Sequence, residues 1–152
     1  MFKKALLWLA FGVVLAAPPA FAGPIEDAKA FVKEGQDALD KAEKTRNDKK
    51  KLELLIAGLA EYARAYSVIT SRKLENDAPD LLQEISDRIK EINERPEVVA
   101  RSQEVRQKAI AALEEGRLVD AYDRFSELRY IDPRKWTVNY ALAIIGQRME
   151  GG

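Results

Sequence analysis

The stretch that decides the fold runs from Val105 to Pro133 and reads VRQKAIAALEEGRLVDAYDRFSELRYIDP. Apolar residues recur in it at three- and four-residue steps, which is the spacing of an amphipathic helix. Gly116 lies near the middle, where a glycine can take a positive φ and end the first helix. Pro133 closes the stretch because it lacks the N–H that would continue a second helix. The stretch therefore predicts two short helices packed as an antiparallel hairpin.

The same residues carry a resemblance to a known family. Counted from Ser102 as the first position, the positions that match are Ala109, Ala112, Gly116, Leu118, Ala121, Phe125, Leu128 and the closing Asp132-Pro133. In this order of small residues, turn glycine and closing proline, the chain resembles a tetratricopeptide repeat (TPR), a helical hairpin of about 34 residues. Lys108 and Val105 depart from the family, which usually has a leucine and a large aromatic residue there. An ordinary helical bundle that matches the pattern by chance is the alternative.

A third helix is expected after the hairpin, from Trp136 to Met149. One hairpin cannot bury its own apolar face, so a neighbouring helix is needed. The side chains expected to pack are Val138, Leu142, Ala143 and Ile145, with Trp136 as a further candidate. A lone helix that follows the last hairpin is a common cap in repeat arrays.

Helical spacing also covers the preceding residues, and strict strand-like alternation is missing from residues 23–152. We expect helices from Pro24 to about residue 43, over 52–70 and from Pro79 to the residue before Pro96, with polar connections at 44–51 and 71–78. The predicted fold is all-α: antiparallel helical hairpins in a TPR-like α-solenoid or bundle of five or six helices. Residues 23–152 form one predicted domain, of which about 97–150 is TPR-like.

The helix over 52–70 is apolar on most of its circumference, so it is expected to be central and covered on more than one side. Tyr62 and Tyr66 are accordingly expected in the core or at its edge. Gly35 interrupts the apolar stripe of the first helix. A glycine inside a helix costs about 1 kcal/mol relative to alanine.

The first 22 residues have the pattern of a secretory signal peptide. Lys3 and Lys4 precede an apolar run from Ala5 to Ala16, and Ala20 and Ala22 are small residues placed for cleavage after Ala22. The run is shorter than the roughly 20 apolar residues that span a bilayer. We therefore expect a periplasmic or secreted protein without an integral membrane span after cleavage. Retention as an uncleaved N-terminal anchor is the alternative.

Composition lowers the prospects of several kinds of activity. The chain has no Cys and no His, which removes thiolate nucleophiles, sulfur ligands, and the commonest general base and transition-metal ligand. Residues 23–152 carry a formal net charge of −2, since both lysines of the leader precede them, and no basic stripe predicts nucleic-acid binding. No cofactor, metal site or catalytic residue is predicted. A hydrolase that uses paired carboxylates is the remaining enzyme alternative.

The resemblance implies protein binding, because such repeats stack and present a surface to a partner. In the family, the inner face of the first helix of each repeat usually lines the groove. On this sequence the positions are Gln103, Arg106, Ile110 and Leu113, then Thr137, Tyr140, Ile144 and Arg148. Burial in the core is the alternative for Ile110, Leu113 and Ile144.

The predicted partner is a protein or peptide of the cell envelope, and a homo-oligomer stays open. Arg106 and Arg148 are expected to meet carboxylates or carbonyls of the partner, and Tyr140 to supply a stiff amphipathic contact. A small periplasmic helical chaperone is the alternative function. The Leu-Thr-x-x-Gln signature of such chaperones is absent from this sequence.

Overall fold

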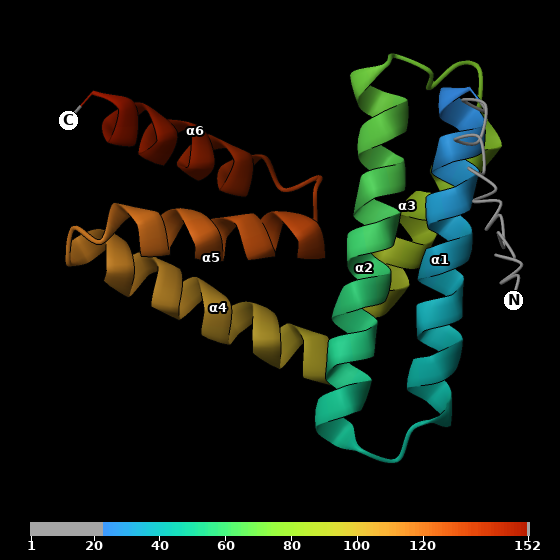
Figure 1. Cartoon of the computed structure of the whole chain (residues 1–152), viewed down its shortest axis with the longest axis horizontal. Helices are drawn as coiled ribbons and strands as arrows, with labels where there is room; N and C mark the ends of the chain where they lie inside the picture. The colour runs from blue at the N-terminus through green and yellow to red at the C-terminus, as the bar shows by residue number, and fades with distance from the viewer. Residues whose placement is uncertain (1–22, 152) are drawn as a thin grey trace, which may run out of the picture.

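The computed structural model describes residues 23–151, which form six α-helices and no strand (Figure 1). The helices are α1 (Pro24–Lys44), α2 (Asp48–Ser71), α3 (Pro79–Asn93), α4 (Pro96–Glu114), α5 (Leu118–Ile131) and α6 (Trp136–Glu150). The prediction of an all-α fold with five or six helices is confirmed. The predicted signal peptide lies outside the described residues. Within 23–151, no helix combines the length and apolar character needed to cross a membrane.

Helices α1, α2 and α3 make up what we call the N-terminal group. Helices α1 and α2 pack as an antiparallel hairpin (Figure 1). The side chain of Asn47 caps α2, because its Oδ1 accepts a hydrogen bond from the backbone N–H of Lys50 at 2.9 Å. Helix α3 begins at Pro79 and buries Ile85, Ile89 and Ile92, and it packs against α2.

The α1–α2 hairpin is held closely together around Gly35. A Cβ atom at this glycine would lie 2.8 Å from Cε2 of Tyr62 and 3.3 Å from the carbonyl oxygen of Gly58. Tyr62 is 1% exposed and its hydroxyl donates to Oε1 of Gln36 at 3.3 Å. Burial raises the pKa of the Tyr62 phenol above its ordinary value. The expected core position of Tyr62 is confirmed, and Tyr66 is partly buried at the edge of the core.

Helices α4, α5 and α6 make up the C-terminal group. The turn between α4 and α5 is a Schellman motif: Gly116 has φ of 73°, its N–H donates to Leu113 at 3.1 Å, and the N–H of Arg117 donates to Ala112 at 2.8 Å. Ala112 of α4 and Ala121 of α5 are fully buried. The hairpin predicted over 105–133 is confirmed.

Helix α6 packs against α5 through Val138, Leu142 and Ile145, which are buried as expected. The expectation was wrong for Trp136 and Ala143: Trp136 is 72% exposed, and Ala143 is exposed too. Both lie on the side of α6 that faces away from α5. Because α6 has apolar residues on two sides and one main neighbour, only one of those sides is covered.

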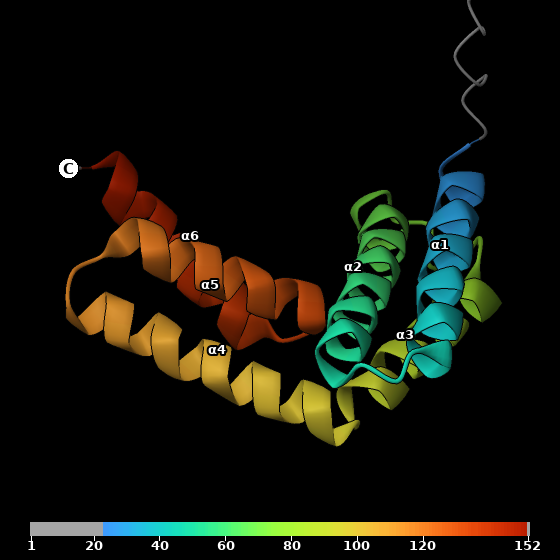
Figure 2. The same cartoon turned by 60° about the horizontal axis from the view of Figure 1, so that its bottom comes forward.

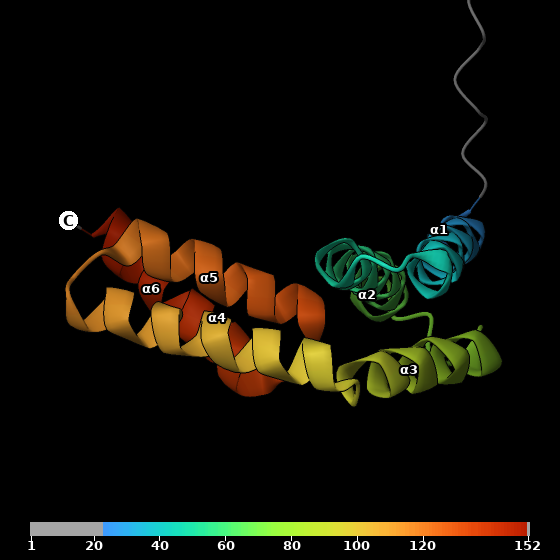
Figure 3. The ribbon, with the colours of Figure 1, turned by 90° about the horizontal axis from the view of Figure 1, so that it is seen from below.

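The two groups meet through α2, which contacts both α4 and α5 (Figures 1 and 2). Helix α4 follows α3 after two residues and leads away from the α1–α2 hairpin (Figure 3). At this junction, Nδ2 of Asn93 donates to the carbonyl oxygen of Ile131 at 2.9 Å, which satisfies the end of α5. Glu43 of α1 pairs with Arg95, and Lys51 of α2 lies 3.4 Å from Glu97 of α4.

Candidate protein-binding surface

Large apolar side chains are exposed only in the later half of the described chain. Eight such side chains are exposed, all between residues 99 and 149, and none lies in 23–98: Val99, Ile110, Val119, Tyr122, Tyr130, Trp136, Tyr140 and Met149. A single exposed apolar side chain is normal on a protein surface. Their concentration on three consecutive helices marks those helices as candidates for interaction.

One side of α4 carries a stripe of exposed apolar and polar side chains. Val99, Gln103, Arg106 and Ile110 follow one another at steps of four, three and four residues, so they lie along one side of the helix. All four are exposed, with Val99 at 39% and Ile110 at 46%. We call this set the α4 stripe. The exposure of Ile110 rules out its alternative placement in the core, whereas Leu113 packs partly against the core.

The first three turns of α4 border a hollow of about 380 Å³. Gln103 and Arg106 line it together with Asn93 and Lys135, and Ile131 supplies an apolar wall. No carboxylate lines this hollow, so its two cations face it without an acidic neighbour in the lining. Its chemistry suits a partner that brings a carboxylate or backbone carbonyls.

The other predicted contact residues lie elsewhere on the C-terminal group. Arg148 lines a different hollow, of about 580 Å³, with Met149 and residues 116–120 at the opposite end of α5. Tyr140 is 63% exposed on the outer side of α6, beside Trp136, at a ring-centroid distance of 6.5 Å. Thr137 is exposed and Ile144 is half-buried. The structure therefore brings Gln103, Arg106 and Ile110 together but separates them from Arg148.

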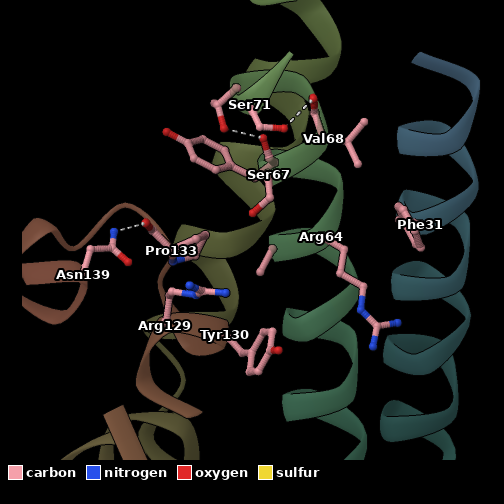
Figure 4. A pocket seen from close by; sticks show the side chains of 12 residues that line it. Phe31, Arg64, Ser67, Val68, Ser71, Arg129, Tyr130, Pro133 and Asn139 are labelled. Carbon is pink, nitrogen blue, oxygen red and sulfur yellow. Dashed lines mark hydrogen bonds between the residues drawn. The ribbon is translucent and has the colours of Figure 1, made fainter. Parts of the chain in front are cut away.

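A further hollow, of about 650 Å³, lies between the two groups of helices (Figure 4). Its lining includes Phe31 of α1, Arg64 and Ser67 of α2, and Arg129 and Tyr130 of α5. The guanidinium of Arg129 lies 6.0 Å from the centroid of the Tyr130 ring, and Arg64 is paired with Glu61 at 2.9 Å. Sequence reasoning missed this hollow, because its residues come from segments about 30 to 60 residues apart that no local pattern connects.

Charged side chains on the described helices form exposed ion pairs. The Arg95 guanidinium, by hydrogen bonding and then by its charge, lowers the pKa of the Glu43 carboxyl, and Lys108 does the same to Glu104. A lowered pKa keeps a carboxyl ionised at neutral pH, so neither is suited to act as a general acid. Among residues 23–151, no three His, Cys, Asp or Glu side chains come together as a metal site would require.

Comparison of the chain with protein-family models, with curated proteins and with solved structures finds no match.

Proposed function

We propose that this protein is an exported, non-catalytic adaptor of TPR-like build, which binds another protein or an extended peptide along the α4 stripe. The observation that carries the proposal is the concentration of exposed large apolar side chains on residues 99–149. The N-terminal group exposes no large apolar side chain and supports the binding helices through the contacts of α2 with α4 and α5.

The α4 stripe has dimensions that fit a short extended segment. Val99 and Ile110 are eleven positions apart, which corresponds to about 16 Å along a helix. An extended chain covers that length with about five residues. Val99 and Ile110 offer apolar anchors at the two ends, and Gln103 and Arg106 offer hydrogen bonds between them.

Charge favours a partner with acidic character at the start of the stripe. Arg106 and Lys135 border the hollow there, and no acidic side chain lines it. An arginine can hold a carboxylate through two parallel hydrogen bonds, which adds geometric specificity to attraction. A partner segment with an acidic residue placed opposite Arg106 and apolar residues on either side is the expected ligand.

A small chaperone is the second candidate. The observation that favours it is the spread of the exposed apolar residues: Val119 and Tyr122 lie on α5 and Trp136 on α6, away from the α4 stripe. A chaperone would use many such patches weakly and would hold many clients. An adaptor would use one surface and hold few.

Photo-crosslinking in intact cells separates these candidates. A photoreactive residue is placed at Ile110 of the full-length protein, and for the control at Ala57, which is exposed on α2. The adaptor predicts a discrete crosslinked band at Ile110 that is absent at Ala57. A smear of many products at Ile110 would favour the chaperone, and equal products at both positions would contradict both candidates.

Matched variants then test the stripe itself. Arg106→Glu combined with Ile110→Asp should abolish the band, because it reverses the charge at the hollow and removes one anchor. Val119→Asp is the control, since Val119 is 60% exposed on α5 and outside the stripe. Circular dichroism should show native helicity in both variants. Loss of the band in the control as well would refute the assignment to α4.

Export and cleavage are tested on the same protein. We expect the mature protein in the cell envelope to begin at Gly23, as read by N-terminal sequencing. An envelope protein that still begins at Met1 would support the anchor instead, and a protein found in the cytoplasm would contradict export.

A further inference from the structure

The outer side of α6 carries an apolar stripe that no helix of the described chain covers. Trp136, Tyr140, Ala143 and Gln147 follow one another at steps of four, three and four residues and are all exposed. They lie opposite Val138, Leu142 and Ile145, which pack on α5. We call these four residues the α6 stripe. The steps of four and three are those of a seam between two paired helices.

We propose that the α6 stripe pairs with the α6 stripe of a second copy of this chain, in antiparallel orientation, to form a two-fold symmetric dimer. This inference goes beyond the proposed adaptor function and does not use the α4 stripe. It assigns Tyr140 to self-association rather than to capture of a partner.

The absence of charge on α6 favours a second copy over a charged partner. Residues 136–147 contain no charged side chain, whereas 33% of the whole chain is charged. This uncharged run of 12 residues is the longest within 23–151. Burying an unpaired charge is costly, and two copies of an uncharged face bury none. A strongly acidic or basic partner would gain no ion pair from this face.

The order of side-chain sizes favours the antiparallel orientation. The two large rings, Trp136 and Tyr140, occupy the first half of the stripe, and the slimmer Ala143 and Gln147 occupy the second half. Antiparallel pairing sets Tyr140 against Ala143 of the partner subunit and Trp136 against Gln147 of the partner subunit. Each ring then meets a smaller side chain, and the Gln147 amide can accept from the indole N–H. Parallel pairing would set ring against ring and leave a gap at Ala143.

The exposed area of Trp136 and Tyr140 sets the expected affinity of the dimer. Large aromatic side chains bury about 150–250 Å² each, and Trp136 and Tyr140 are 72% and 63% exposed. Four such rings in the dimer supply about 500 Å² of apolar area, and stable interfaces bury more than about 1,000 Å² in total. The dimer is therefore expected to dissociate in the micromolar range rather than the nanomolar range.

Sedimentation equilibrium of the exported protein over about 1–300 µM tests the dimer, a range set by that expected affinity. We expect the average mass to rise from monomer to dimer across it. Tyr140→Glu and Ala143→Glu should each keep the protein monomeric at every concentration, with unchanged helicity and, at low protein concentration, an unchanged melting temperature. Val119→Glu, at an equally exposed apolar position on α5, should dimerise like the unmodified protein.

Two outcomes would overturn the proposal: an unmodified protein that stays monomeric throughout, or a dimer that persists in Ala143→Glu. Neither outcome would affect the crosslinking at Ile110, so failure of the dimer and failure of the adaptor are distinguishable.

Disulfide trapping tests the orientation, because the chain has no cysteine of its own. Trp136→Cys and Gln147→Cys variants are purified separately, mixed and oxidised. Antiparallel pairing predicts that the mixed disulfide between the two variants forms faster than either symmetric disulfide. Preferential formation of the symmetric Trp136→Cys product would show parallel pairing and refute the orientation.

Discussion

The N-terminal and C-terminal groups are built from the same kind of helix and differ in what they leave exposed. Two tyrosines show the difference: Tyr62 of α2 is 1% exposed and Tyr140 of α6 is 63% exposed. Both helices are apolar on more than one side. Helix α2 contacts α1, α3, α4 and α5, whereas α6 packs mainly on α5. The number of neighbours, and not the composition of the helix, decides whether a second apolar side becomes core or surface.

The largest effect is expected from removing the buried ring of Tyr62, and very little from removing the exposed ring of Tyr140. Tyr62→Ala should lower the free energy of unfolding by about 3–5 kcal/mol, because it leaves a cavity among α1, α2 and their neighbours. Tyr140→Ala should change it by less than about 0.5 kcal/mol in the monomer, as expected for an exposed side chain. Urea denaturation at low protein concentration measures both. Similar losses in the two variants would refute the contrast between the groups.

Smaller changes in stability, of opposite sign, are expected when the glycines at positions 35 and 146 are replaced by alanine. Gly35→Ala gains about 1 kcal/mol of helix propensity. Its Cβ would lie 2.8 Å from the Tyr62 ring, and overpacking of this kind costs about 1–3 kcal/mol. We therefore expect net destabilisation.

Gly146→Ala is the matched variant, because a Cβ there meets no atom within 4 Å. It should stabilise the protein by about 0.5–1 kcal/mol through the lost freedom of the unfolded chain. Thermal melting followed by circular dichroism measures both changes. Stabilisation by Gly35→Ala would mean that α1 and α2 are not in close contact at this point.

The smallest effect is expected at the ion pair between Glu43 and Arg95, which joins α1 to the segment between α3 and α4. Arg95 lowers the pKa of Glu43 in the folded protein. The pair therefore contributes stability above the pKa that Glu43 has in the unfolded chain, and this contribution is lost as the pH falls through the folded value.

In Arg95→Gln, the pKa of Glu43 should rise back toward its ordinary value of 4.5. The destabilisation relative to the unmodified protein should be small at neutral pH and vanish in acid. Carboxyl NMR titration of Glu43 checks the first statement, and melting at several pH values checks the second. An unchanged Glu43 titration in the variant would show that the pair does not form in solution.

Helix boundaries set by proline and glycine were predictable because local chemistry determines them. Pro79 and Pro96 open α3 and α4, and Gly116 ends α4, each for a reason that involves only its own helix end. The expected start of α2 was wrong: we expected a polar connection up to residue 51, but Asn47 caps the helix, which already begins at Asp48. The central place of α2 was predictable too, since a helix that is apolar on most sides has to be covered.

Features that depend on distant segments were not predictable in the same way. Ala143 was expected to pack, with Trp136 as a further candidate, and the sequence could not show which apolar side of α6 would meet α5. The place of Gly35 inside its helix was predicted correctly, but its contact with Tyr62 joins residues 27 positions apart in the sequence. Among the predicted contact residues, spacing along a single helix fixes the relation of those on α4, but it could not show that Arg148 of α6 would line a different hollow from Arg106.

The single main neighbour of α6 also has a consequence for local unfolding. Opening α6 breaks its packing on α5, whereas opening α2 disrupts contacts with four helices. Backbone amides of α6 should therefore exchange with solvent faster than those of α2, through openings that leave α1 to α5 folded. Pairing with a second copy should slow this exchange in α6 selectively. Amide protection of the last helix would then report how much of the protein is paired.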